Sequence, residues 1–189
     1  MMPNERLVDY NPIESEIDVK ALKPQVGKIK IHEHRPAFDA VYMQDPSGRI
    51  IAYITFKPYW GDESTVEVES FTNEAARKQG IQKRLNQELL HVLIERGVTA
   101  IVGHIQIDNS PSLLNRTKVQ SPDGKGVLKA EALNIDWVEE KLNNGAQIQP
   151  FTVELKIYLH EVVADNGKLL SKIRTIQHAL TENRYGLSV

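Results

Sequence analysis

A change of hydrophobic period near residue 72 constrains the fold more than any other feature of the sequence. From Thr65 to Phe71, valines alternate with glutamates, which is the two-residue period of a strand. From Ile81 onward, apolar residues recur every three or four positions, which is the period of an amphipathic helix. Gly97 follows Arg96 and predicts the end of that helix. A strand that leads into a helix over 78–96 predicts an α/β domain.

Further strands and helices are predicted on both sides of this unit. Alternating or apolar segments rich in Val, Ile and Tyr predict strands over 28–34, 38–43, 49–56, 100–107 and 151–160. The sequence Asp-Pro-Ser-Gly at 45–48 predicts the turn of a β-hairpin. Helical spacing predicts helices over 112–118, 129–143 and 166–183.

This order of elements predicts three parts in the chain of 189 residues. Residues 1–26 contain three prolines and no sustained period, so we expect an irregular N-terminal segment. The central domain should occupy 27–160, with an insertion at 120–149. Residues 161–189 form a C-terminal helical extension, whose apolar stripe either folds back on the chain or forms a homodimer contact.

The loop before the long helix has the properties of a phosphate-binding site. Arg77, Lys78, Lys83 and Arg84 place four cations within eight residues, and the interval contains no acid. The first turn of a helix offers unpaired backbone N–H groups and a partial positive charge, so phosphates bind there readily. Gly80 removes a Cβ atom where a phosphate would approach the backbone. The alternative is a solvated helix start without a ligand.

Composition narrows the classes of function. The net charge is −2, from 23 basic and 25 acidic residues, so we expect no nucleic-acid partner. A weaker alternative is an unrelated α/β domain whose basic loop binds nucleic acid or another phosphate compound. The chain contains no cysteine, which excludes disulfides and thiolate catalysis. No apolar run approaches the roughly 20 residues that span a bilayer, and the N-terminus lacks a signal-peptide pattern. We therefore expect a cytoplasmic protein.

The order of motifs resembles the GNAT superfamily of N-acetyltransferases. The resemblance rests on a strand, Arg77-x-x-Gly80-x-Gln82, a long helix ended by Gly97, a second strand, and Asn109-x-x-Ser112. It covers about residues 28–119, and residues 151–159 are similar to the closing strand of the family. The implied fold is a mixed, mostly antiparallel sheet flanked by helices, here with an extra C-terminal helix.

The resemblance also implies a cofactor, which is acetyl-CoA or another acyl-CoA as the acyl donor. Backbone amides of the loop would hold its pyrophosphate, and the end of the preceding strand would hold its pantetheine arm. The residues that the resemblance assigns to cofactor binding are Phe71, Thr72, Arg77, Lys78, Gln79, Gly80, Ile81, Gln82, Lys83, Arg84, Asn109, Ser112 and Arg116. For Asn109 and Ser112, a simple helix cap is the alternative.

Two positions depart from the family pattern. Gln82 stands where the family usually has glycine or alanine, so its side chain must turn away from the pyrophosphate. Arg116 stands where the family often has a tyrosine that protonates the departing thiolate. Arginine cannot donate a proton near neutral pH, so Arg116 would act by its charge.

Two carboxylates are the candidate catalytic residues. Glu67 and Glu69 share one face of the strand before the loop, and in a GNAT-like site that strand flanks the thioester. Glu69 is the preferred general base for the acceptor amine, and Glu67 is more simply a surface carboxylate. His104 could be a base, but a core histidine is the simpler interpretation. His32 and His34 lack a third ligand, so we expect no metal site.

The resemblance therefore predicts an acyl-CoA-dependent N-acyltransferase, most simply one that transfers acetyl to an amine by direct attack in a ternary complex. The alternative is a catalytically inactive GNAT-fold protein with a binding or regulatory role. The sequence does not identify the acceptor amine.

Overall fold

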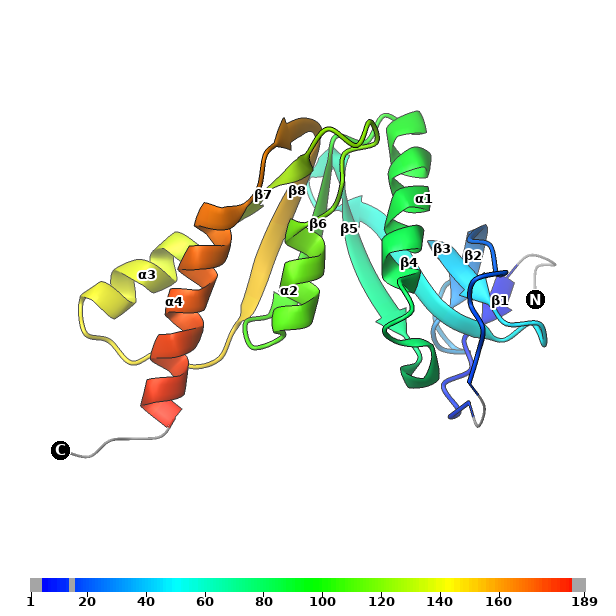
Figure 1. Ribbon diagram of the computed structural model, residues 1–189, viewed down its shortest axis with the longest axis horizontal. Helices are drawn as coiled ribbons and strands as arrows, with labels where there is room; N and C mark the ends of the chain where they lie inside the picture. The colour runs from blue at the N-terminus through cyan, green and yellow to red at the C-terminus, as the bar shows by residue number, and fades with distance from the viewer. Residues whose placement is uncertain (1–4, 14–15, 185–189) are drawn as a thin grey trace. The chain divides into compact units, whose positions relative to one another are not determined.

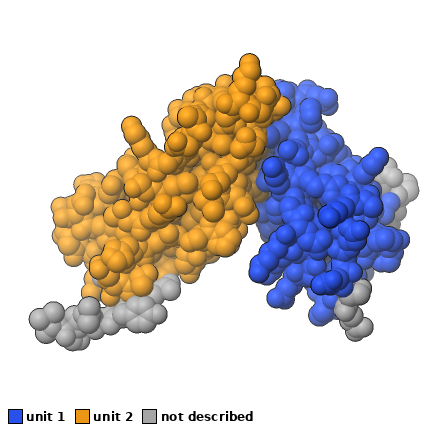
Figure 2. Space-filling model, in the orientation of Figure 1, with its two compact units in different colours: residues 1–98 blue, residues 99–189 orange. Residues whose placement is uncertain are grey.

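The computed structural model describes residues 5–13 and 16–184 and contains two compact units. Unit 1 comprises Met1–Val98 and unit 2 comprises Thr99–Val189 (Figure 2). Each unit has a sheet and at least one helix packed against it (Figure 1). The two units are described in turn.

Unit 1 is built on a sheet in the order β1-β2-β3-β4-β5. Its strands are β1 (Glu5–Leu7), β2 (Gln25–Lys30), β3 (Phe38–Gln44), β4 (Ile50–Tyr59) and β5 (Asp62–Thr72). β1 pairs with β2 in parallel, and the other neighbours pair antiparallel. β4 and β5 form a long hairpin, in which the β-branched and aromatic residues of β4 are almost all buried.

One face of this sheet is covered by a helix, and part of the other face is covered by the N-terminal segment. α1 (Ile81–Glu95) lies against β3 and β4 on one face, and its buried residues Leu85, Leu89 and Leu93 recur at helical spacing. On the other face, Val8 from the N-terminal segment packs with the residues of β2, β3 and β4. The short 3-10 helix η1 (Glu74–Ala76) connects β5 to the loop that precedes α1.

Unit 2 has a smaller antiparallel sheet in the order β6-β8-β7. Its elements are β6 (Ala100–Gln106), α2 (Ser110–Thr117), β7 (Val127–Ala132), α3 (Ile135–Asn143), β8 (Thr152–Val163) and α4 (Gly167–Arg184). Every second residue of β8 is buried, namely Val153, Leu155, Ile157 and Leu159. This alternation shows that only one face of β8 packs against the core.

The apolar stripe of α4 is covered within the same chain. Ile173, Ile176 and Leu180 are all buried, and α4 contacts β7 and α3. The expectation that this helix folds back is therefore confirmed. A homodimer through α4 stays a prediction, and this stripe gives it no support. Among the described residues, no helix is long and apolar enough to cross a bilayer.

The structure confirms a mixed fold whose sheets are mostly antiparallel and flanked by helices, but it corrects several segments. The N-terminal segment is not wholly irregular, because β1 pairs with β2. The helix predicted over 129–143 is wrong in its first half, where β7 forms an edge strand against β8. The helical part of that insertion is α3. The predicted domain at 27–160 remains a prediction. The two compact units divide the chain after Val98, and this division does not test where a functional domain begins or ends.

The two histidine predictions on strands also need correction. β2 ends at Lys30, so His32 and His34 lie in a bend, and both are exposed. His104 is exposed on β6, opposite Glu154 in the register with β8, so it is not a core histidine. Its neighbours Gly103 and Ile105 are buried, which explains why the apolar sequence gave the wrong prediction.

A single buried amide joins three elements of unit 2. Asn166 Nδ2 donates to the carbonyl oxygens of Thr117 (2.8 Å) and Leu128 (3.0 Å), and its Oδ1 accepts from the amide of Ala130 (3.0 Å). Asn166 thereby satisfies backbone groups of α2 and β7 at the start of α4. These groups would otherwise be buried without partners, which is costly.

We expect Asn166→Ala to lower the free energy of unfolding by about 3 kcal/mol, because it leaves a buried amide and two carbonyl oxygens unpaired. Urea unfolding followed by circular dichroism would measure the change. Asn115→Ala, at an exposed position of α2, is the matched control and should change stability by less than about 0.5 kcal/mol. Equal effects of the two variants would show that the buried amide has no special role.

Candidate functional site

The loop between β5 and α1 has an unusual backbone. Asn73 caps η1, with its side-chain oxygen accepting from the amide of Ala75 (3.2 Å). Arg77 is then extended, with φ −69° and ψ 163°. Lys78 and Gly80 follow with φ values of 61° and 73°, and Gly80 is the N-cap of α1. Two left-handed residues so close to a helix start bend the chain sharply just before the first N–H groups of α1.

The backbone conformation at position 80 requires glycine, and the absence of a side chain leaves open space there. A side chain rarely adopts a φ of +73°, whereas glycine does so without steric cost. A Cβ atom built on Gly80 would find no heavy atom within 4 Å. Apart from its neighbours in the chain, no described residue therefore fills the space beside Gly80 where α1 begins, so a ligand could approach the backbone there.

Among the described residues, no side chain caps the first turn of α1. The amide of Arg84 makes the first helical bond, to the carbonyl oxygen of Gly80 (3.2 Å). The N-cap glycine has no side chain to accept from the preceding N–H groups, and the first turn contains no acidic residue. The partial positive charge of this helix end is thus left for a ligand to balance.

The side chain of Gln82 folds back toward β5. Its Nε2 donates to the carbonyl oxygen of Phe71 (2.9 Å) and to Thr72 Oγ1 (2.7 Å). Arg77 Nε also donates to the carbonyl oxygen of Thr72, at 3.3 Å. The glutamine that departs from the family pattern therefore fixes the first turn of α1 to the end of β5. Its side chain points away from the open space at Gly80, as the sequence required.

The four predicted cations divide into two groups. Arg77, Lys78 and Lys83 are exposed around the loop. Arg84 is half-buried, and its guanidinium donates to the carbonyl oxygens of Val19 (2.7 Å) and Leu22 in the N-terminal segment. Arg84 is thus occupied in fixing that segment to α1, and we leave it out of the phosphate site that we propose below.

The two candidate catalytic carboxylates, both on β5, lie in different surroundings. Glu67 forms a salt bridge with Lys57, which is its partner in the β4–β5 register (3.1 Å). Glu69 is exposed and pairs in register with Thr55. Within the described residues, Glu69 forms no salt bridge. Glu69 is therefore the carboxylate whose charge is less compensated by protein.

Next to Glu69 lies an aromatic cluster that sequence analysis did not single out. Phe71 stacks on Tyr53, with ring centroids 5.4 Å apart, and meets the edge of Tyr10 at 5.2 Å. The hydroxyl groups of Tyr10 and Tyr53 are hydrogen-bonded at 3.0 Å. The hairpin register predicts the pairing of Tyr53 with Phe71, so this half of the cluster could have been found from the sequence. Tyr10 could not, because it comes from a segment without a regular period.

The remaining predicted site residues belong to unit 2. Asn109 caps α2, with Oδ1 accepting from the amide of Ser112 (3.3 Å), which is the helix-cap alternative. Arg116 is buried, and burial lowers the pKa of its guanidinium to about 10, so it stays charged at neutral pH. Neither observation tests a contact with a cofactor, and these assignments stay predictions.

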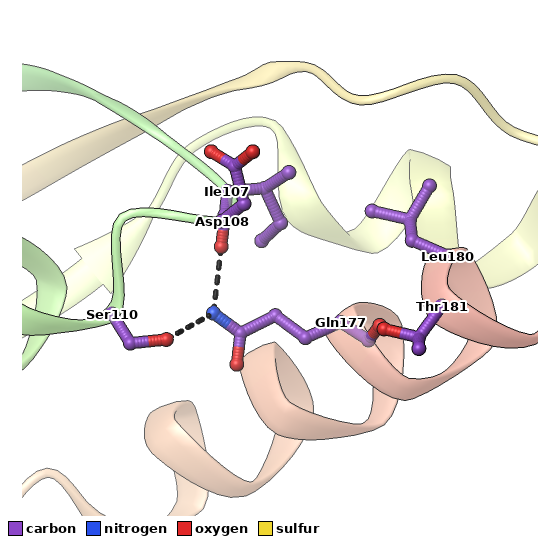
Figure 3. A pocket seen from close by; sticks show the side chains of 6 residues that line it. All are labelled: Ile107, Asp108, Ser110, Gln177, Leu180 and Thr181. Atoms are coloured by element: carbon purple, nitrogen blue, oxygen red, sulfur yellow. Dashed lines mark hydrogen bonds between the residues drawn. The ribbon is translucent and has the colours of Figure 1, made fainter. Parts of the chain in front are cut away.

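A small open pocket in unit 2 contains none of the predicted site residues. Gln177 spans it, with Nε2 donating to the carbonyl oxygen of Ile107 (2.6 Å) and to Ser110 Oγ (3.1 Å) (Figure 3). The volume of this pocket is about 190 Å³, which is below the roughly 300 Å³ of the smallest usual ligand sites. The residues that line it are Ile107, Asp108, Ser110, Gln177, Leu180 and Thr181.

Comparison with known families decides the assignment of the fold. The model of the acetyltransferase (GNAT) family matches residues 5–114, which is more than half of the chain and includes the loop and both glutamates. The chain belongs to the GNAT family of acetyltransferases. The matched segment contains β5, the loop that follows it and α1.

Individual GNAT proteins show partial similarity to the chain. The Bacillus subtilis protein YwnH, provisionally named a phosphinothricin acetyltransferase, is 32% identical over 84 residues, which are 43% of this chain and 50% of YwnH. The chain thus matches about half the length of this curated relative.

Two solved structures are also similar. A Sinorhizobium meliloti phosphinothricin acetyltransferase in complex with acetyl-CoA is 18% identical, with a TM-score of 0.44 over 68% of this chain and 65% of that one. The Escherichia coli N-acetyltransferase YhbS, in complex with CoA, is 29% identical, with a TM-score of 0.35 over 41% and 43% of the two chains.

Proposed function

We propose that this GNAT protein is an acyl-CoA-dependent N-acyltransferase, most simply an acetyltransferase with an amine acceptor. One observation carries the proposal: the N-terminus of α1 is uncapped, free of acids and surrounded by exposed cations, and Gly80 leaves open space beside it. Pyrophosphate would lie at this helix end. The names of the relatives, which include complexes with acetyl-CoA and CoA, support the same donor.

The proposed phosphate site consists of the backbone N–H groups of residues 79–83 and the side chains of Arg77, Lys78 and Lys83. The backbone at the end of β5, at Phe71 and Thr72, would bind the pantetheine arm. The Phe71 carbonyl already accepts from Gln82, so the arm would have to share or replace that bond. Asn109 and Ser112 are retained as proposed cofactor contacts, and Arg116 as a proposed source of positive charge.

In the proposed reaction, a neutral amine attacks the thioester carbonyl carbon. The C–N bond forms, the C–S bond breaks, and coenzyme A leaves as a thiolate. Glu69 accepts the proton that the amine nitrogen loses. Thiols are much stronger acids than alcohols, so a thiolate is a good leaving group that needs little help from an acid. The chain has no cysteine that could carry an acyl intermediate, so transfer would be direct.

Calorimetric titration with acetyl-CoA, coenzyme A and ATP tests donor binding. We expect micromolar affinity for acetyl-CoA and coenzyme A and weaker binding of ATP. Transfer is then measured with a thiol-reactive dye over a panel of amines that includes phosphinothricin, because YwnH carries that name. Since the protein has no cysteine, every thiol detected comes from released coenzyme A. Absence of binding to all three ligands would contradict the proposed function.

A non-catalytic GNAT protein is the second candidate. The observation in its favour is that Arg116 is a buried arginine at the position where the family often has a tyrosine acid. This candidate predicts acetyl-CoA binding without thiol release for any amine. Its location, like that of the enzyme, is proposed to be the cytoplasm, which cell fractionation would test.

The different surroundings of two neighbouring cations give a further prediction. Lys83→Met should weaken acetyl-CoA binding about threefold to fivefold with little effect on stability, because it removes an exposed charge near the phosphates. Arg84→Met should leave the affinity within about twofold but lower the free energy of unfolding by about 2 kcal/mol, because two carbonyl groups lose a charged donor. Calorimetry and urea unfolding measure both. The reverse pattern would return Arg84 to the phosphate site.

A further inference from the structure

The aromatic cluster of unit 1 presents an exposed surface beside the proposed base. Tyr10 is 45% exposed, although it is a large aromatic residue, and Phe71 is half-buried beneath it. Tyr53 is only 2% exposed and forms the floor of the cluster. The N-terminal segment is anchored next to Tyr10 by Val8, which is buried in the core on this face of the sheet. The ring of Tyr10 is thus exposed, and the packing of Val8 and Phe71 holds it in place.

The hydroxyl of Tyr53 fixes the orientation of Tyr10. The two hydroxyl groups are 3.0 Å apart, and the edge of the Tyr10 ring packs on Phe71. Burial, the hydrogen bond to Tyr10 and the charge of Glu69 all raise the pKa of the Tyr53 hydroxyl far above its usual value. Tyr53 therefore stays neutral at physiological pH and can act only as a hydrogen-bonding partner.

Glu69 lies on the same face as this cluster. Residues two apart in a strand point to the same side of a sheet, so Glu69 and Phe71 project in the same direction from β5. Tyr53 faces Phe71 directly and Glu69 diagonally, because Glu69 pairs with Thr55. Diagonal neighbours are about 7–8 Å apart, within reach of long side chains. An exposed carboxylate and an exposed aromatic surface therefore adjoin.

We propose that Tyr10, Phe71 and Glu69, here called the aromatic subsite, bind the acceptor and select a primary amine carried on an aromatic or flat apolar body. This inference rests on the proposed N-acyltransferase function and narrows its acceptor class. Tyr10 is the specificity-determining residue, because it supplies the exposed ring. Tyr53 is a positioning residue that acts through Tyr10.

The chemistry of the three side chains fits that class of acceptor. The carboxylate of Glu69 attracts a protonated amine, and the face of an aromatic ring also attracts a cation. Offset or edge-to-face contact with Tyr10 and Phe71 would favour an aromatic body over a short alkyl chain. An acceptor with its own carboxylate, such as an amino acid, would meet the negative charge of Glu69. The subsite therefore favours simple arylalkylamines over amino acids.

The experiment compares 2-phenylethylamine with ethylamine, which has the same amino group but no ring. Saturation-transfer NMR titration measures the affinity of each amine for the full chain, alone and with coenzyme A, so turnover is not needed. We expect 2-phenylethylamine to bind about tenfold more tightly, the size of one good aromatic contact. Tyr10→Ala should reduce this preference to about twofold or less. Tyr10→Phe retains the ring but loses the hydrogen bond to Tyr53, so it should lower the preference only about threefold.

Trp60→Ala is the matched control. Trp60 is 97% exposed at the turn between β4 and β5, so it is an accessible aromatic residue of unit 1 outside the cluster. Its removal should leave the preference at about tenfold. Tyr53→Phe should lower the preference about threefold without changing the affinity for acetyl-CoA, because it only loosens Tyr10. If Tyr10→Ala does not fold, Tyr10→Leu replaces it, because leucine keeps most of the apolar volume without an aromatic ring. Tyr10→Leu should also lose the preference for 2-phenylethylamine.

Three results would overturn the aromatic subsite. They are equal binding of the two amines to the unaltered protein, an unchanged preference in Tyr10→Ala or Tyr10→Leu, and loss of the preference in Trp60→Ala. Failure of the proposed function is distinguishable from all of them, because it shows as absence of acetyl-CoA binding, whereas the amine titrations are also performed without coenzyme.

Discussion

We expect Gly80→Trp to abolish measurable acetyl-CoA binding in a protein that still folds. Gly80 has a φ of +73°, which an L-residue adopts at a cost of about 1–2 kcal/mol. A side chain there would also fill the open space where the proposed pyrophosphate approaches the N-terminus of α1. Loss of that contact should weaken binding by at least about a hundredfold, and calorimetry would measure it.

Gly48→Trp is a close control for this variant. Gly48 also belongs to unit 1, has a φ of +85°, and has no heavy atom within 4 Å of a built Cβ. It lies in the turn between β3 and β4, away from the loop at 77–84. The two variants should lose similar stability, but only Gly80→Trp should lose the coenzyme. Normal acetyl-CoA binding by Gly80→Trp would mean that the phosphate site has been misplaced.

The second large effect is expected for Glu69→Gln. If Glu69 accepts the proton of the attacking amine, an amide at this position removes the base while keeping nearly the same shape. General base catalysis contributes about 10²–10⁴ in rate, so kcat/KM for the amine should fall by that factor. The affinity for acetyl-CoA should stay within about twofold, since Glu69 does not belong to the phosphate loop. Thiol release and calorimetry measure the two quantities.

Glu67→Gln makes the same chemical change two residues away on the same face of β5. Glu67 is already paired with Lys57, so its loss should reduce kcat/KM by less than about tenfold. If instead Glu67→Gln were the more damaging variant, the salt-bridged carboxylate would be the base. Similar small losses in both would exclude the two carboxylates from proton transfer and favour an amine that reaches the thioester already deprotonated.

The sequence located the loop correctly but not the conformation within it. A strand period followed by a helix period placed a basic turn between β5 and α1, as the structure has it. The helix begins at Ile81 instead of Lys78, because Lys78 and Gly80 take positive φ values. Residue spacing does not encode such local dihedral angles. The fold of Gln82 back onto β5 likewise depends on where the strand ends in space.

Two other features that local patterns do not reveal come from contacts between distant residues. Helical spacing predicted a helix from residue 129, yet residues 127–132 form β7 because β8, about 30 residues later, supplies their hydrogen bonds. Trp137 and Leu142 do lie in a helix, α3. Arg84 looked like a phosphate ligand by its place in the loop. Its guanidinium instead meets carbonyl oxygens 62 and 65 positions earlier in the chain. Tertiary pairing overrode the local pattern in both cases.

The amide of Asn166 has a consequence for how the chain is made. It bonds to the carbonyl oxygen of Thr117, 49 residues earlier, and to the amide of Ala130, 36 residues earlier. Synthesis proceeds from the N-terminus, and compact units generally fold as they emerge. All of unit 1, with the loop at 77–84, can therefore leave the ribosome before Asn166 is made. During that interval α2 and β7 lack the partner that their backbone groups need, so unit 2 can be completed only after Asn166 has been added to the chain.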